Sequence, residues 1–157
     1  KDDRTALLDI EVTALLDEFR GDLDSLEAVT EADTVLNALA PHMNIVVLSN
    51  VNSAQAPARL RNLADLGLPF ALVANSGPKG PFVKTLAARA KRPTFFVDDI
   101  PMHHASVAEL APEVFRIHLI GDARLKPLLP KAEHAHIRAD TWREADAFIR
   151  AKLAEMP

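Results

Sequence analysis

From Asn44 onward the chain repeats one pattern, a short apolar run rich in β-branched or aromatic residues followed by a stretch with helical spacing of its apolar residues. The first kind of run is typical of buried strands, and the second is typical of helices that pack one face on a sheet. Their alternation predicts a parallel sheet covered on both faces, with right-handed crossovers. We therefore expect an α/β fold with three layers, in which a parallel sheet lies between helices.

The residues themselves set approximate bounds for these elements. Strands are expected at 44–50, 69–75, 94–99, 114–121 and, weakly, at 135–140, and helices at 53–67, 81–91, 103–110 and 141–153. In the first of these helices the expected buried face consists of Ala56, Leu60, Leu63 and Leu66. Gly67 is expected to end this helix, and Thr141 with Glu144 should form a capping box at the start of the last one.

Composition removes several classes of protein from consideration. A chain of 157 residues with 48% hydrophobic residues is the size of one domain with a full core, here 1–157. Its net charge of −4 and its lack of a basic face argue against a nucleic-acid partner. The absence of cysteine excludes disulfides and thiolate metal sites and fits a reducing, cytoplasmic location. No apolar run approaches the roughly 20 residues of a membrane span.

Polar residues follow three of the expected strands at the point where each strand ends. Because ligands of parallel α/β sheets bind beyond the carboxyl ends of the strands, we expect these side chains to share one rim. Lys79 lies just past the second strand and should reach the same rim. The strand-end residues are Ser49, Asn50, Asn75, Asp98 and Asp99.

Asp98 and Asp99 place two like charges side by side at the end of an apolar strand. At 4 Å their repulsion is about 4 kcal/mol for an effective dielectric constant near 20, and a bound cation would cancel it. Oxygen ligands of this kind suit Mg²⁺, which takes one or two carboxylates together with phosphate oxygens. Ser49 and Asn50 offer polar groups, and Lys79 a positive charge, to a bound phosphate. The alternative is that the two acids only cap the following helix.

Three motifs, IVVLSN, PKG and FFVDD, occur in this order and resemble the second, third and fourth motifs of the haloacid dehalogenase-like (HAD) hydrolases. The resemblance covers about Asn44 to Gly121 and matches Ser49, Lys79 and the Asp98–Asp99 pair to the family's motif residues. It implies a HAD-like core domain, built on a Rossmann-like α/β sheet, that hydrolyses phosphate monoesters of small metabolites. The reaction would use Mg²⁺ and pass through an aspartyl-phosphate.

The family's first motif is a strand that ends in Asp-x-Asp, and its first Asp is the nucleophile. The candidate here is ALLDIEVT, in which Asp9 and Glu11 stand for the pair and Thr13 follows. However, the spacing of apolar residues favours a helix, so we interpret 1–30 as a helical N-terminal segment or cap remnant. The first strand is then expected upstream of Lys1 or from another source. An unpaired central edge would favour a homo-oligomer. The apolar residues of that helical face are Leu8, Val12, Leu15, Leu16 and Phe19.

Other interpretations stay open beside the hydrolase. A degenerate HAD fold without catalysis would serve binding or assembly, and a receiver-like phospho-acceptor domain also pairs acids at a strand end. His103 and His104 follow the acidic pair, and we interpret them as surface or rim residues, with contact to substrate or metal as the alternative. The same interpretation applies to the later histidines, and Lys84 is interpreted as an exposed helix residue. The later histidines are His118, His134 and His136.

Overall fold

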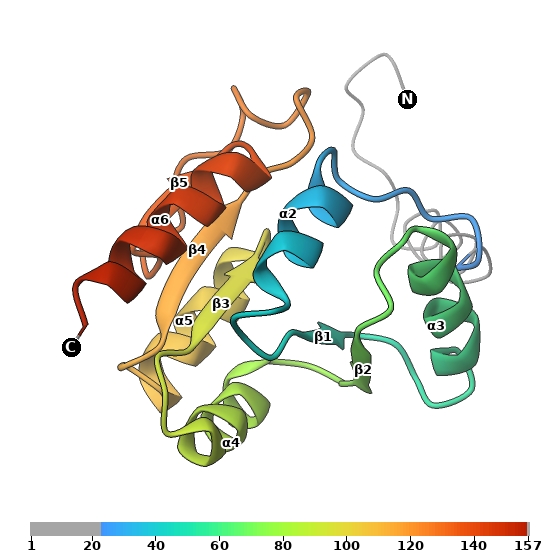
Figure 1. Cartoon of the computed structure of the whole chain (residues 1–157), viewed down its shortest axis with the longest axis horizontal. Helices are drawn as coiled ribbons and strands as arrows, with labels where there is room; N and C mark the ends of the chain where they lie inside the picture. The colour runs from blue at the N-terminus through green and yellow to red at the C-terminus, as the bar shows by residue number, and fades with distance from the viewer. Residues whose placement is uncertain (1–22, 157) are drawn as a thin grey trace, which may run out of the picture.

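The structure is a computed structural model, and it describes residues 23–156 of the chain. The elements that were expected from residue 44 onward all form, with ends shifted by a few residues (Figure 1). Within the described range, no helix is both long enough and apolar enough to cross a bilayer. In chain order the elements are α2 (Ala32–Leu39), β1 (Val46–Ser49), α3 (Ala56–Asp65), β2 (Ala71–Ala74), α4 (Gly80–Ala90), β3 (Phe95–Asp98), α5 (Pro101–Leu110), β4 (Phe115–Leu119), β5 (Ile137–Ala139) and α6 (Trp142–Ala154).

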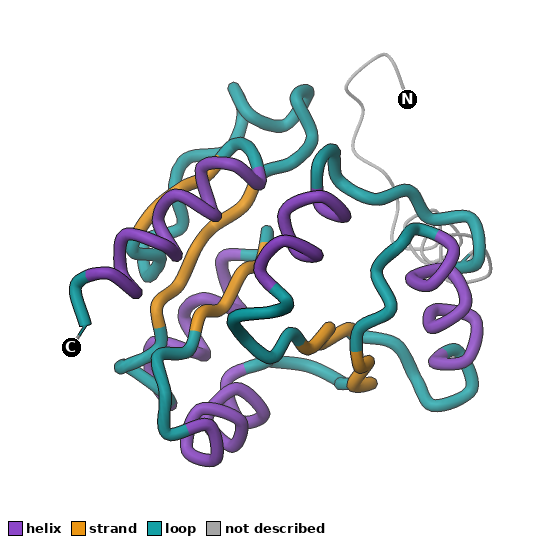
Figure 2. Tube along the Cα trace, in the orientation of Figure 1, coloured by secondary structure: helices purple, strands orange, loops and turns teal. Residues whose placement is uncertain are grey.

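All strand pairs are parallel, which confirms the expected α/β class, but they form two sheets instead of one. β1 pairs with β2, and β3, β4 and β5 form a second sheet with β4 in its centre. Between residues 23 and 156 no strand joins β1 to β3, and Figure 2 shows the two sets of strands apart. Residues 23–156 therefore do not form the single continuous sheet that was expected for a three-layer fold.

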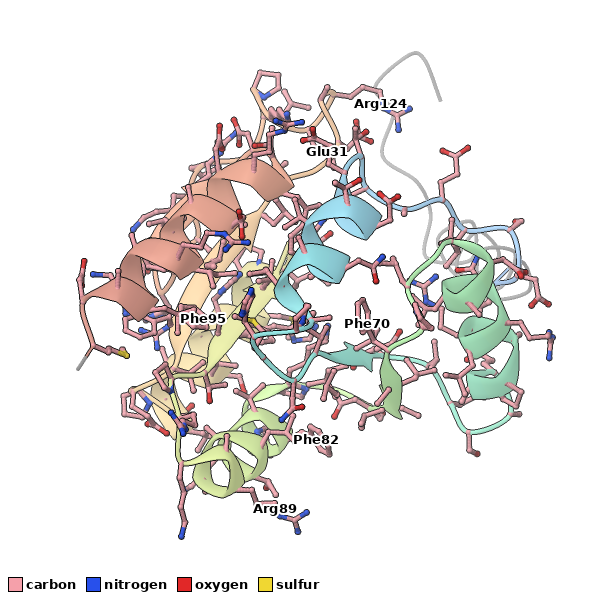
Figure 3. All side chains as sticks on the ribbon, in the orientation of Figure 1. Glu31, Phe70, Phe82, Arg89, Phe95 and Arg124 are labelled. Carbon is pink, nitrogen blue, oxygen red and sulfur yellow. The ribbon has the colours of Figure 1, made fainter. Side chains whose placement is uncertain are left out.

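Helices cover both faces of the second sheet. Alternate residues of its strands point to opposite sides, so each face has its own hydrophobic cluster. On one face, Ile117 and Leu119 of β4 pack with α2 and α6, and Phe95 (labelled in Figure 3) packs against the same cluster. On the other face, Phe96 of β3 packs with α4 and α5. The first cluster is Val35, Leu39, Ile117, Leu119, Ala139, Ala145 and Ile149, and the second is Val83, Ala87, Phe96, Val107, Ala111 and Val114.

The buried face of α3 differs from the expected one. Leu60 is 46% exposed, whereas Asn62 is only 2% exposed. The side-chain amide of Asn62 donates to the backbone carbonyls of Asp24 and Leu26, at 3.1 and 2.8 Å. Residues 23–30 therefore cover this side of α3, and they do so as turns and irregular chain, not as the expected helix. The rest of that expected segment, 1–22, lies outside the described residues.

The two predicted helix-end signals are present in the structure. Gly67 follows α3 with a φ of +71°, a left-handed conformation that favours glycine. Thr141 is the N-cap of α6, and its hydroxyl accepts a hydrogen bond from the Glu144 amide at 3.2 Å. The capping box is modified, because the Glu144 carboxylate accepts from the Asp140 amide at 2.6 Å.

Replacing Gly80 with alanine is expected to lower the free energy of unfolding by about 1–3 kcal/mol, because it overpacks a tight helix contact. A Cβ atom at Gly80 would lie 2.3 Å from the backbone oxygen of Ser106 on α5. Urea denaturation measures the change. As the matched control, Ala90→Ser alters an exposed position of the same helix and should shift stability by less than about 0.5 kcal/mol. Equal shifts in the two variants would contradict the close approach of α4 and α5.

Candidate functional site

Lys79 and Asp98, two of the predicted site residues, form an ion pair that is largely buried. Asp98 is the last residue of β3, and Lys79 immediately precedes α4. The distance from Lys79 Nζ to Asp98 Oδ2 is 2.6 Å, and the side chains are 14% and 4% exposed. Charge-assisted contacts of this length are the stronger class of hydrogen bond. The structure therefore brings together a lysine and a carboxylate from two separate motifs.

The start of α4 is held in place by close packing on α5. The Gly80 amide donates to the Ser106 hydroxyl at 3.1 Å, and the absent side chain of Gly80 lets the two helices meet there. α5 begins directly after the acidic pair. This contact consequently fixes the residue before Gly80, which is Lys79, next to the end of β3.

The second oxygen of Asp98 organises the turn that follows β3. Asp98 Oδ1 accepts a hydrogen bond from the Ile100 amide at 2.9 Å. Ile100 is the N-cap of α5, and α5 has no acidic residue in its first turn and no side-chain cap bond. Neither acid therefore supplies the N-cap side chain of α5, although Asp98 bonds the amide of the N-cap residue. Asp98 instead forms a local side-chain turn of the type that Asp favours.

The side chain of Asp99 is more exposed to solvent than that of Asp98. Its side chain is exposed and has no hydrogen bond or ion pair with any residue in the described range. Asp98 and Asp99 both line a cavity of about 390 Å³ beyond the ends of β3 and β4. The walls of this cavity are mainly apolar. The other lining residues are Val29, Val97, Leu119, Ile120, Gly121, Asp122, Leu125, Leu129 and Trp142.

Ser49 and Asn50 lie at the end of β1 and connect to the loop that carries Lys79. Asn50 accepts from the Asn75 side chain at 2.7 Å and donates to the Gly77 carbonyl at 3.1 Å. The Asn50 side chain therefore bonds this loop in the structure. Its contact with a phosphate remains a prediction. Ser49 is half-buried, and its hydroxyl has no hydrogen-bond partner in the described part of the chain. Ser49 is thus linked to Lys79 only through this loop.

A second cavity of about 390 Å³ lies between the two sheets. Both β1 and β3 line it, as does Lys79. Each of these strands is paired along one edge, and its other edge has no backbone partner among residues 23–156. Val46 of β1 is 37% exposed, although strands of parallel sheets are usually buried on both faces. We call this cavity the inter-sheet cleft.

Three histidines beside the acidic pair are buried, so their interpretation as surface or rim residues was wrong. His103 is 3% exposed, and His104 and His118 are fully buried. His134 and His136 are exposed, as expected. The helical spacing of His104 with the buried Val107 and Ala111 contained this information, because the three share one face. His118 is buried because β4, the central strand, is covered on both sides.

Burial also sets the ionisation of two of these histidines. Desolvation lowers the pKa of His103 below its usual value, against the opposing effect of the Asp98 charge. Desolvation likewise lowers the pKa of His104, although its hydrogen bond to the Asp98 carbonyl favours the protonated form. Both imidazoles are therefore held in the neutral state near neutral pH.

The predicted Mg²⁺ ligands meet the requirements of that ion in part. Among the described residues no group of three or more His, Asp or Glu side chains could hold a metal. Mg²⁺ needs fewer, because it commonly binds one or two carboxylates and completes its shell with water and phosphate oxygens. The exposed carboxylate of Asp99 is available for this role, and Asp98 has lone pairs beyond its two hydrogen bonds.

The candidate site is thus a buried lysine–aspartate pair with a second, exposed carboxylate beside it. It lies at the carboxyl ends of parallel strands, where such folds bind ligands. The side chain of Asn50 bonds the loop before α4, which carries Lys79, at the Gly77 carbonyl. Comparison with known proteins identifies no relative, since no family model matches the chain and no curated protein is similar to it in sequence.

Proposed function

We propose that the protein is a Mg²⁺-dependent phosphoester hydrolase of the HAD-like type that acts on a small phosphorylated metabolite. The observation that carries this proposal is the 2.6 Å contact between Lys79 and Asp98, with Asp99 exposed beside it. A lysine in contact with one of two adjacent carboxylates at a strand end suits the binding of a phosphate together with a cation. The motif order that resembles this superfamily supports the same conclusion.

Each residue has a distinct role in the proposed reaction. Asp98 and Asp99 would hold Mg²⁺, which when bound supplies positive charge to the phosphoryl oxygens. Lys79 keeps the Asp98 carboxylate in place and adds a positive charge where the transferred phosphoryl group develops negative charge. Ser49 would donate its hydroxyl to a phosphate oxygen. The leaving group would lie in the cavity beyond β3 and β4, whose mainly apolar walls suit a compact organic group.

We also propose that a parallel strand occupies the inter-sheet cleft and joins both sheets into one Rossmann-like sheet. The unpaired edges of β1 and β3 and the apolar lining of the cleft support this proposal. In HAD-like enzymes the central strand carries the nucleophile. The candidate within this chain is the strand 6–9, ending at Asp9, and the competing interpretation is the helix predicted for the same residues. This segment lies outside the described residues.

The proposed activity is tested by assaying the full-length protein against a broad panel of phosphate monoesters. Turnover is expected with Mg²⁺ and should disappear when EDTA removes the metal. Asp98→Asn should weaken Mg²⁺ binding in calorimetry. If the wild-type protein with Mg²⁺ hydrolyses no member of the panel, the hydrolase proposal is wrong, and a non-catalytic binding module becomes the better interpretation.

A second experiment tests whether Asp9 is the nucleophile. Asp9→Asn should reduce turnover by more than about 10³-fold while Mg²⁺ binding persists, because covalent catalysis needs the free carboxylate. Asp17→Asn removes the same charge from the same segment and serves as the control, with turnover expected to stay near the wild-type value. Equal turnover in both variants would exclude Asp9 as the nucleophile and favour the helical interpretation of the segment around it.

A further inference from the structure

Buried histidines hold both backbone carbonyls of the acidic pair. His104 Nε2 lies 2.9 Å from the carbonyl oxygen of Asp98, and His118 Nε2 lies 3.0 Å from the carbonyl oxygen of Asp99. Both imidazoles are fully buried. One histidine comes from α5 and the other from β4, so two separate elements converge on consecutive peptide groups.

The hydrogen bonds of these histidines fix where their protons lie. His118 Nδ1 accepts from the Ala132 amide at 3.0 Å, so its proton must be on Nε2, which donates to Asp99. His104 Nε2 faces a carbonyl and therefore also donates. Its Nδ1 has no partner among the described residues and is buried, and it is a bare acceptor in this tautomer. Each imidazole thus acts as a neutral donor to the acidic pair.

These contacts begin where the sheet's own hydrogen bonds end. The β3–β4 register finishes with Asp98 opposite His118, so the Asp99 peptide lies beyond the ladder. An apolar side chain could fill the space of either imidazole without the cost of burying a polar ring. Unlike an apolar side chain, each imidazole donates a hydrogen bond to one of the two carbonyls. The turn carrying the two carboxylates is consequently held by His104, His118 and the bond from Ile100 to Asp98.

We propose that His104 and His118 are positioning residues that set the orientation of the Asp98 and Asp99 carboxylates. The role rests on the proposed function in one respect, since the oriented carboxylates are the expected Mg²⁺ ligands. Partners that orient metal ligands in this way commonly change metal affinity by about 10–100-fold when they are replaced. The positioning itself is a property of the protein alone and can be measured without metal or substrate.

A pair of conservative variants separates positioning from packing. His118→Gln keeps a donor at the place of Nε2, whereas His118→Asn keeps only the group at the place of Nδ1 that faces Ala132. The readout is hydrogen exchange of the Ile100 amide, which donates to Asp98 within the same turn. His118→Asn should raise its exchange rate by about tenfold or more relative to His118→Gln. His104→Gln and His104→Asn form a second, independent pair if either His118 variant does not fold.

Mg²⁺ titration of the same variants, followed through amide chemical shifts, completes the test. In the expected result the Asn variants bind Mg²⁺ about tenfold more weakly than the Gln variants at matched urea stability. If wild type binds no Mg²⁺ and hydrolyses no phosphoester, yet Ile100 exchange still differs between Gln and Asn, the proposed function is wrong and the positioning role stands. Equal Ile100 exchange in the Gln and Asn variants at both positions would overturn the positioning role.

Discussion

Lys79→Met is expected to abolish phosphoester turnover and to lower the free energy of unfolding by roughly 3–5 kcal/mol. Lys79 Nζ is the partner of a carboxylate that is only 4% exposed, and the substitution leaves that charge buried without its cation. Removing one member of a buried pair costs far more than the net value of the pair, because the other charge remains desolvated. Urea denaturation and the phosphatase assay measure the two effects.

Lys84→Met is the matched control, because Lys84 is an exposed residue of the same helix, as the sequence predicted. Its unfolding free energy should change by less than about 0.5 kcal/mol. The double variant Lys79→Met/Asp98→Asn should regain part of the lost stability, with a coupling energy of about 1–3 kcal/mol, yet stay inactive. If Lys79→Met is as stable as Lys84→Met, the Lys79–Asp98 contact does not hold the end of β3.

Local patterns were sufficient to predict most elements of the fold. The apolar runs that became β1 to β4 are bounded by turn-forming residues, and two of the helices, α3 and α6, carry recognisable ends at Gly67 and Thr141. Parallel pairing followed from the alternation of strands and helices. The register of burial was harder to predict. Asn62 replaced Leu60 on the buried face of α3 because residues 23–30, distant in sequence, provide carbonyls for its amide.

The division into two sheets could not be derived from the pattern of 44–157 alone. Strand order depends on which strand edges pair in space. The spacing of apolar residues along the chain distinguishes strands from helices, but it does not indicate which strands are neighbours. The weakness of residues 1–30 as a strand did predict an unpaired central edge. In the structure β1 and β3 line the inter-sheet cleft without pairing across it.

The candidate site was predictable where strand ends and motif order determine it. Lys79 and Asp98 were expected at one rim, and they are in contact. The hydrogen bond from the Asn50 amide to the loop was not expected. A side-chain amide can bond a ligand or a backbone carbonyl equally well, so the sequence does not decide between the two. The buried histidines were missed because their polarity outweighed their helical spacing in the interpretation. Burial of an imidazole is favoured by hydrogen-bond partners, and for His104 and His118 these are the carbonyls of the acidic pair.

Acidification from pH 7.5 to 5.5 is expected to destabilise the fold through His103 and His104. Burial lowers the pKa of both below the usual 6.5, so the unfolded chain takes up protons at a higher pH than the folded protein does. Because the unfolded state then binds more protons, stability is complete above about pH 6.5 and is lost as the pH falls below it. Each histidine contributes at most about 1.4 kcal/mol per pH unit.

Charges around the two imidazoles modify the size of this effect without reversing its sign. Asp98 favours the protonated form of both histidines, and Asp99 does so for His103. Lys79 opposes protonation of His103, and Arg116 opposes it for His104. Desolvation exceeds the attraction by the acids in both cases, so the direction of the pH dependence follows from burial.

Urea denaturation at pH 7.5, 6.5 and 5.5 measures the dependence, with two variants to assign it. His104→Gln keeps a donor for the Asp98 carbonyl but cannot titrate, so its stability should fall less steeply with pH than that of wild type. His42→Gln replaces an exposed histidine and should keep the wild-type slope. A wild-type stability that stays constant down to pH 5.5 would mean that the folded protein protonates these imidazoles. A protonated imidazole donates from both ring nitrogens and therefore needs a second acceptor. The packing between α5 and β4 would then have to loosen near Asp98 and Asp99 to admit water or another partner.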